Sequence, residues 1–253
     1  MNKNFRSLEA FTEHVADMLS DHVLETPSHT PYVLQTPLFV WCFNYGSMVY
    51  HSNLAKDYDV CIIVSHELRD IVASVLDSDT IKSYLINGYP IDVKMVAYSD
   101  MDVTELLELD YAIKTESSCY KPMILGLSQG YIKKDSMECL PSLSLNNKKY
   151  VRHSISQKCS NSFVKAKKKL TVEKDYDRYS SMKSLFHSIR MARFAYDYGK
   201  NGIINPSACT ELYLEIKKDY DTHTDEEILE LIGTKYKKIY NDRMSLFRLL
   251  YPK

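Results

Sequence analysis

The sequence predicts an α+β fold in which a mixed β-sheet with flanking helices comes first and an all-helical region follows. Two short apolar runs, Leu38–Phe43 and Val60–Val64, have the length of buried strands. An Asn87-Gly88 pair between two further apolar segments is a strong signal for a β-hairpin. Beyond Thr115 the strand pattern fades, and apolar residues recur with the period of a helix. The sheet is therefore expected in the first half of the chain.

The change of pattern near Thr115 also predicts two domains. With 253 residues, the chain is long enough for two small domains that each bury a core. We expect a compact α/β domain over residues 1–115 and a helical domain over residues 116–253. The formal net charge is −1, so any contact with a polyanion must depend on a local basic patch.

The first predicted element is an amphipathic helix over residues 5–24. Its apolar residues recur at steps of three and four, so they form one stripe that can cover a face of the sheet. The segment Glu25–Pro37 contains three prolines, which exclude a helix. The elements expected next are a strand at 38–44, a turn at Gly46-Ser47, a short helix around 47–53, a strand at 58–64, a helix at 66–76, and hairpin strands at 82–86 and 91–97.

Helices are predicted for most of the chain after the hairpin. Asp102 and Glu105 form a capping-box pattern that opens a helix through about Ala112. The polar segment Lys134–Asn147 carries Pro141 and is expected to cross between helices. The further helices expected are 119–128, 148–170, 177–199, 206–218 and 225–250, the last interrupted at Gly233.

Neither a membrane span nor a secretion signal is predicted. No apolar run approaches the roughly 18 residues that a spanning helix needs, and the N-terminus lacks the apolar core of a signal peptide. We therefore expect a soluble, cytoplasmic protein. The six cysteines are scattered without a C-x-x-C pair, so neither a zinc site nor a disulfide framework is indicated.

A glycine turn and two aspartates lie between the two central apolar runs. Gly46-Ser47 follows the first strand, and after a gap of nine residues Asp57 and Asp59 stand at the head of the second. Side chains alternate along a strand, so the two aspartates share a face, about 7 Å apart. Such hard oxygen ligands suit Mg²⁺, which binds a couple of carboxylates together with substrate phosphates. The glycine lets the backbone approach a polyphosphate, and a helix beginning at Ser47 would turn its free N–H groups toward the anion.

Each of these features is common alone, but their order is informative. Gly-Ser, a gap of nine residues and Asp-x-Asp resemble the signature of the DNA polymerase beta-like nucleotidyltransferase superfamily. That pattern includes a third acidic residue on a later strand, which Asp92 in the apolar run Ile91–Val96 matches. The resemblance implies a polymerase-beta-like catalytic core. The catalytic and metal-binding residues that it implies are Asp57, Asp59 and Asp92, and the nucleotide-binding residues are Gly46 and Ser47.

A second motif lies in the helical region. Lys183, His187 and Arg190 are spaced so that they share one helical face, from which they could reach a triphosphate. Periodicity alone favours a simpler interpretation, a solvated face with His187 hydrogen-bonded to its neighbours. However, the string KSLFHSIRMARFAYDYGKNG at 183–202 is similar to the Lys-x-x-x-His-x-x-Arg helix of the predicted nucleotidyltransferases associated with bacterial and phage RNA repair. The preceding FVKAKKKL at 163–170 matches that family's layout, and the resemblance implies nucleotide-binding roles for all three residues.

A basic run precedes this motif. Runs of this kind are usually solvated faces, but beside an active site they can follow an RNA backbone. No aromatic-basic RNA-binding module is recognisable. RNA is therefore one expected acceptor. The residues of the run and its surroundings are Lys165, Lys167, Lys168 and Lys169, with Arg152, Lys158 and Lys174 nearby.

Together these features predict a Mg²⁺- or Mn²⁺-dependent nucleotidyltransferase. It would move a nucleoside monophosphate from an NTP to an acceptor hydroxyl, with an RNA end, tRNA-like or broken, as the favoured acceptor. The aspartates would hold two metal ions, Asp92 could accept the proton of the hydroxyl, and the cationic helix would neutralise the leaving pyrophosphate. Two alternatives stay open, a protein-modifying (adenylylating) enzyme and a non-catalytic relative that binds a nucleotide or RNA.

Overall fold

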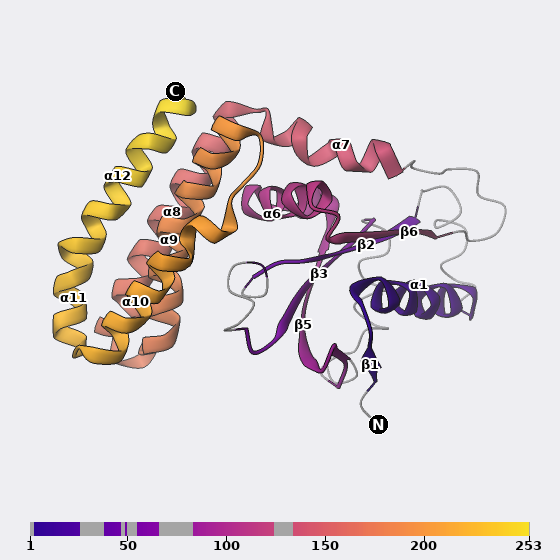
Figure 1. Ribbon diagram of the computed structural model, residues 1–253, viewed down its shortest axis with the longest axis horizontal. Helices are drawn as coiled ribbons and strands as arrows, with labels where there is room; N and C mark the ends of the chain where they lie inside the picture. Colours follow the sequence, from indigo (N-terminus) through magenta and orange to yellow (C-terminus); the bar gives the residue numbers. More distant parts are fainter. Residues whose placement is uncertain are drawn as a thin grey trace. The chain divides into compact units, whose positions relative to one another are not determined.

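The computed structural model describes residues 3–25, 38–46, 49, 55–65, 83–123 and 134–252 (Figure 1). Its architecture is α+β, with one mixed sheet and a majority of helical residues among those described. The chain forms two compact units. The first comprises Met1–Met101 and Glu108–Pro141, and the second comprises Asp102–Leu107 and Ser142–Lys253.

The first unit is built on a mixed sheet of six described strands. They are β1 (Asn4–Phe5), β2 (Leu38–Asn44), β3 (Tyr58–Val64), β4 (Leu85–Ile86), β5 (Tyr89–Ala97) and β6 (Ser118–Met123). Their order in the sheet is β1-β4-β5-β3-β2-β6, with β1–β4 and β3–β5 parallel and the other pairs antiparallel. The strands predicted from the two central apolar runs are confirmed, and they are hydrogen-bonded neighbours.

Helix α1 (Leu8–Glu25) packs against one face of this sheet (Figure 1). Its apolar stripe, with Phe11, Val15 and Leu19 fully buried, forms a core with the residues of β2 and β3 that point to the same face. Side chains alternate along a strand, so Trp41 and Phe43 of β2 point to the opposite face, where they are buried as well. The predicted N-terminal helix is confirmed, but it begins at Leu8 rather than at residue 5, and Phe5 belongs to β1.

The hairpin turn and the helix cap predicted from the sequence are present. Asn87 (φ 51°) and Gly88 (φ 82°) adopt the left-handed conformations of a tight turn between β4 and β5. Helix α6 (Val103–Lys114) begins at a capping box. Asp102 Oδ1 accepts from the Glu105 N–H at 3.2 Å, and Glu105 Oε2 accepts from the Asp102 N–H at 2.8 Å. The beginning of α6 groups with the second unit and its remainder with the first.

The second unit is helical. Its long helices are α8 (Lys148–Thr171), α9 (Arg178–Asn201), α10 (Thr210–Thr222), α11 (Asp225–Gly233) and α12 (Lys235–Leu250). Helix α9 is central, since it packs against α8, α10 and α12, and its residues Leu185, Ile189 and Ala192 are fully buried. The predicted interruption at Gly233 is confirmed as the end of α11. The other predicted ranges agree within a few residues, apart from a 3₁₀ turn at Pro206–Cys209 before α10.

Residues 118–123 form strand β6, so the predicted helix at 119–128 is wrong over its described part. β6 pairs with β2 along its length, and the Tyr120 ring contacts those of Phe39 and Trp41. Local periodicity could not reveal this pairing, because the partner strand lies far earlier in the chain. The first compact unit consequently extends to Pro141, past the boundary near residue 115 that the sequence suggests.

Residues 134–145 form helix α7 (Lys134–Leu145), where the sequence predicts a polar crossing segment. Its buried residues Met137, Pro141 and Leu145 recur at steps of four and make a narrow apolar stripe. The surrounding polar residues hide this stripe in the sequence. A proline inside a helix also removes one backbone hydrogen bond and argues against helix locally. Burial of the stripe therefore outweighs local propensity.

Several predictions fall outside the described residues. They are the proline-rich segment beyond Glu25, the short helix around 47–53, the helix at 66–76 and the start of the hairpin strand at 82–86.

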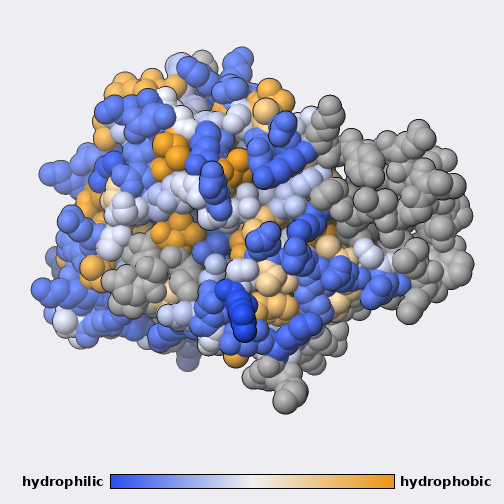
Figure 2. All heavy atoms as spheres, turned by 45° about the vertical axis from the view of Figure 1, so that its right-hand side comes forward, coloured by the Kyte–Doolittle hydropathy of each residue, from blue (hydrophilic) through white to orange (hydrophobic). Residues whose placement is uncertain are grey.

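The visible surface is largely hydrophilic. On the face drawn in Figure 2, hydrophobic residues form small separate groups among hydrophilic ones. Among the helices that the structure describes, none is long and apolar enough to cross a membrane. All six cysteines are free thiols, and Cys42 and Cys61 are buried in the central strands β2 and β3.

Candidate metal centre

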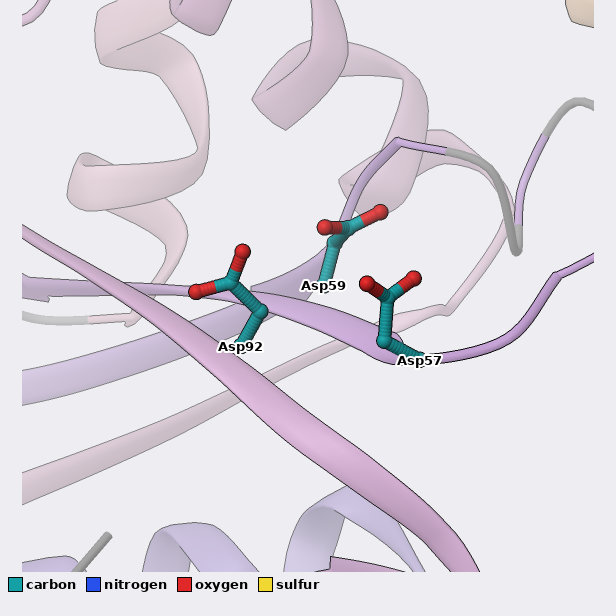
Figure 3. A group of neighbouring side chains, drawn as sticks. All are labelled: Asp57, Asp59 and Asp92. Carbon is teal, nitrogen blue, oxygen red and sulfur yellow. The ribbon is translucent and has the colours of Figure 1, made fainter. Parts of the chain in front are cut away.

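Three carboxylates converge at one place on the sheet of the first unit. Asp57 directly precedes β3, Asp59 is the second residue of β3, and Asp92 lies in β5. One ligand oxygen from each carboxylate lies within 4.8 Å of the other two. Figure 3 shows the three side chains pointing toward a common space from the two neighbouring strands. The structure therefore brings together the three aspartates that the sequence motif singles out.

The register between β3 and β5 explains this convergence. The two strands are parallel, and Asp59 stands opposite Asp92. Alternation places Asp57 on the same face as Asp59, while Val60 and Ile62 point to the other face and join the core with α1. The carboxylates thus lie on the face that α1 does not cover. Asp92 is exposed and the other two are partly exposed, so a ligand can reach all three.

The donor set fits a hard divalent cation. Three negative charges at this separation repel one another, and a cation between them removes that repulsion. None of the described lysines or arginines forms an ion pair with Asp57 or Asp92. Mg²⁺ and Mn²⁺ prefer carboxylate oxygens, and Mg²⁺ usually keeps positions for water or phosphate. Three carboxylates on an accessible face meet this requirement.

Gly46 makes room for the Asp59 carboxylate. Its φ of +71° is left-handed, and a Cβ at this position would lie 2.0 Å from Asp59 Oδ2. The backbone N–H of Tyr45 donates to the Asp59 carbonyl oxygen at 3.1 Å, which ties the turn to the start of β3. The glycine of the motif therefore determines the space available to the Asp59 carboxylate as well as the course of the backbone. Ser47, its predicted partner, lies outside the described residues.

Tyr45 places a neutral hydroxyl beside the carboxylates. Burial raises the pKa of the Tyr45 phenol far above its usual value, and the negative charges of Asp59, Asp92 and Glu108 raise it further. The phenol therefore stays protonated and can donate a hydrogen bond. Neither Tyr45 nor Glu108 is predicted as a site residue from the sequence. Tyr45 could have been suggested by its position next to Gly46 in the sequence, whereas only the fold places Glu108 near the phenol.

Lys183, His187 and Arg190 belong to the second unit and share one stripe of α9. Lys183 is exposed, with its Nζ 5.0 Å from the centroid of the Tyr179 ring. Arg190 Nη2 lies 3.3 Å from His187 Nδ1, and its guanidinium carbon lies 5.4 Å from the Phe186 ring centroid. The contact of His187 with a neighbour on its own helix, expected from periodicity, is thus present.

His187 is neutral in this setting. Burial, the largest cause, and the positive charges of Arg190 and Lys158 together lower the pKa of the imidazole to about 3, while Asp102 opposes them. In the sequence Lys158 is noted only as a neighbour of the basic run. The packing of α8 on α9 brings Lys158 close to His187. Without a ligand, His187 therefore offers a hydrogen bond rather than a positive charge at neutral pH.

No family model, curated protein or solved structure matches this chain. Functional inference therefore rests on the sequence motifs and on the geometry of each unit. The carboxylates with Gly46 form one group in the first unit, and the α9 stripe forms another in the second.

Mg²⁺ or Mn²⁺ should raise the thermal unfolding temperature of the wild-type protein, because an ion that binds only the folded state stabilises it. The Asp57→Asn/Asp59→Asn variant should lose this response. In EDTA the same variant should unfold at or above the wild-type temperature, since the substitution removes like-charge repulsion. Differential scanning fluorimetry with and without metal measures both effects.

Asp100→Asn provides the matched control, because Asp100 is an exposed aspartate of the same unit outside the cluster. It should keep the full metal response. A double variant that unfolds earlier in EDTA and still responds to metal would contradict the assignment.

Gly46→Ala should weaken metal binding, and Gly88→Ala should not. Both glycines have positive φ, so alanine costs about 1–2 kcal/mol of backbone strain at either position. Only at Gly46 does the new Cβ collide with a ligand carboxylate, whereas at Gly88 it meets nothing within 4 Å. Mn²⁺ titration followed by electron paramagnetic resonance should give an affinity about tenfold lower for Gly46→Ala. Equal affinities for the two variants would argue that the position of Asp59 does not matter for binding.

Proposed function

We propose that the chain is a Mg²⁺- or Mn²⁺-dependent nucleotidyltransferase. It moves a nucleoside monophosphate from an NTP to an acceptor hydroxyl, with an RNA end as the favoured acceptor, and releases pyrophosphate. The observation that carries the proposal is the convergence of Asp57, Asp59 and Asp92 on an accessible face, with ligand oxygens within 4.8 Å of one another. Three such ligands suit the divalent cations that assist phosphoryl transfer.

We further propose that the first unit has a polymerase-beta-like core. The order of its elements supports this. Strand β2 leads into the Gly46 turn, β3 carries Asp57 and Asp59 at its start, and β5 adds Asp92 from the adjacent position in the sheet. This order agrees with the motif that the sequence resembles.

In the proposed reaction the oxygen of the acceptor hydroxyl attacks the α-phosphorus of the NTP. The bond between the α-phosphorus and the oxygen that bridges it to the β-phosphorus breaks, and pyrophosphate leaves. Asp57, Asp59 and Asp92 would hold the metal ions, which would supply positive charge to the triphosphate and lower the pKa of the hydroxyl. Asp57 and Asp59 orient the triphosphate side of the site. Asp92, the exposed member, has room to accept the proton of the hydroxyl. Tyr45 donates a hydrogen bond without adding negative charge.

The α9 stripe binds the polyphosphate in this proposal. Lys183 supplies an exposed point charge, and Arg190 supplies a planar fork that can contact two phosphate oxygens. His187 donates a hydrogen bond while neutral. A phosphate beside it favours the charged imidazole and raises its pKa, so the charge on this residue follows the presence of the ligand.

The wild-type protein should transfer label from an α-labelled NTP to RNA. Four such NTPs are incubated in turn with Mg²⁺ or Mn²⁺ and total RNA, and the products are separated on a denaturing gel. The Asp57→Ala/Asp59→Ala variant should transfer nothing, because it lacks two metal ligands. Its circular dichroism spectrum should match the wild type, since neither carboxylate belongs to the core.

The products decide between the proposal and its alternatives. Label on protein would identify a protein-modifying enzyme. Equal labelling by the double variant would refute the proposed role of the carboxylates. If the protein binds metal but labels neither RNA nor protein nor small molecules, the result would favour the alternative of a non-catalytic protein that binds a nucleotide or RNA.

Lys183→Ala should weaken NTP binding, and Lys200→Ala should not. Both lysines are exposed on α9, and each stands over the tyrosine four residues before it, at 5.0 and 5.9 Å from the ring centroid. The two substitutions therefore remove the same charge and the same ring contact. Only Lys183 shares a stripe with His187 and Arg190, so we expect about tenfold weaker binding of a fluorescent NTP analogue by its variant. Equal affinities would assign the stripe to a solvated helix face.

A further inference from the structure

Helix α8 concentrates positive charge in a chain whose formal net charge is only −1. Its 24 residues include no aspartate or glutamate. A basic helix face is often only solvated, so the surroundings of each charge decide whether it can bind a ligand. The lysines and arginines of α8 are Lys148, Lys149, Arg152, Lys158, Lys165, Lys167, Lys168 and Lys169.

Acidic partners are present in the middle and at the C-terminal end of this helix. Lys158 pairs with Asp102, and Lys168 and Lys169 pair with Asp175. At the N-terminal end no acidic side chain among the described residues pairs with Lys149. The N-terminus of a helix also carries a partial positive charge. This end of α8 is therefore the more attractive one for an anion.

An open groove of about 740 Å³ lies at this end of α8. Lys149, Arg152 and His153 of α8 line it together with Arg248 of α12, and two serines and a glutamine of α8 complete the lining. Four of these seven residues are cationic or can become so, the other three carry hydroxyl or amide groups, and none is acidic. The groove thus offers hydrogen-bond donors and no fixed negative charge.

Arg152 ties the two walls of the groove together. Its guanidinium donates to the carbonyl oxygen of Tyr251 and, at 3.4 Å, to that of Arg248. Carbonyl groups at the C-terminal end of a helix lack helical partners, so this contact satisfies them and anchors α12 to α8. The side chains of Lys149, His153 and Arg248 remain exposed. Arg152 is therefore structural, whereas the other three are available to a ligand.

Beyond the groove, an aromatic contact lies on the same stripe of α8. The lining residues of α8 recur at steps of three and four from Lys149 to Ser160, a span of about 16 Å. The next residue on the stripe is Phe163, whose ring centroid lies 4.8 Å from that of Tyr240 of α12, and Lys167 Nζ lies 5.6 Å from the Phe163 centroid. A positive groove and aromatic rings in one line are the combination that binds single-stranded nucleic acids.

We propose that this face of α8, together with Arg248, binds the sugar–phosphate backbone of a single-stranded nucleic acid. Lys149 and Arg248 neutralise phosphates, and the hydroxyl and amide groups bond to phosphate or sugar oxygens. The phosphodiester chemistry is common to RNA and DNA. The proposal rests on the proposed function only in identifying the bound strand as the acceptor, since the groove lies within the second unit and needs no metal ligand.

The Lys149→Ala/Arg248→Ala variant should bind a single strand about tenfold more weakly than the wild type. Fluorescence anisotropy is measured with a labelled single-stranded RNA and with DNA of the same sequence, in EDTA and without NTP. The dependence of log affinity on log salt concentration should become shallower by about 0.7 for each phosphate that the variant no longer neutralises. Lys217→Ala/Lys218→Ala removes the same two charges from exposed positions on α10 and should bind like the wild type.

Two further variants distinguish the possible causes of weaker strand binding. Lys149→Arg/Arg248→Lys keeps both charges and should restore binding, which distinguishes lost charge from a damaged fold. Asp57→Ala/Asp59→Ala should bind the strand normally, so failure of nucleotide transfer and failure of this inference give different results. Tighter binding of RNA than of DNA would support contacts to the 2′-hydroxyl, and equal binding would support recognition of the backbone alone.

Three results would overturn the inference. The first is that the wild-type protein binds neither strand. The second is that the α10 control loses as much affinity as the groove variant. The third is that poly-glutamate competes as well as unlabelled RNA. The second result would indicate a general charge effect, and the third would indicate an acidic protein partner.

Discussion

The parallel pairing of β3 with β5 is the constraint on which the candidate metal centre depends. It sets Asp59 opposite Asp92, and the alternation of β3 adds Asp57 on the same face. A slip of one residue would turn a carboxylate toward the face covered by α1 and turn core residues such as Val60 and Ile62 away from it. The apolar core therefore enforces the register that gathers the charges, and the same alternation specifies both the fold and the site.

Electrostatics in the two units have opposite signs that the net charge of −1 conceals. The first unit holds three carboxylates within reach of one ion, and Gly46 and the neutral phenol of Tyr45 accommodate them without adding charge. The second unit holds a helix with no acidic residue and a histidine kept neutral by burial and neighbouring cations. Like charges repel one another in each arrangement, and a ligand of the opposite sign would relieve that repulsion, a cation in the first unit and an anion in the second.

The sequence predicts an element correctly where neighbouring residues determine its structure. It fails to predict an element whose structure depends on pairing with a distant segment. Alternation predicts that Asp57 and Asp59 share a face, and the capping box predicts the start of α6. The strand β6 is missed because it depends on β2, and α7 is missed because Pro141 and polar neighbours obscure a stripe only one residue wide. Neither the proximity of Lys158 to His187 nor the groove between α8 and α12 can be predicted from one helix alone.

The two inferred sites differ in the range of the forces they use. A metal ion is held by direct coordination, so the first unit needs carboxylate oxygens fixed within a few ångströms, which a sheet register provides. A nucleic-acid backbone is attracted over about a Debye length, so the second unit needs only charges kept on one face, which the period of a helix provides. Arg152, which donates to the carbonyl groups at the end of α12, can therefore stabilise the fold while its exposed neighbours remain available to a ligand. A fixed strand register and an adaptable helix face are the supports that these two chemistries require.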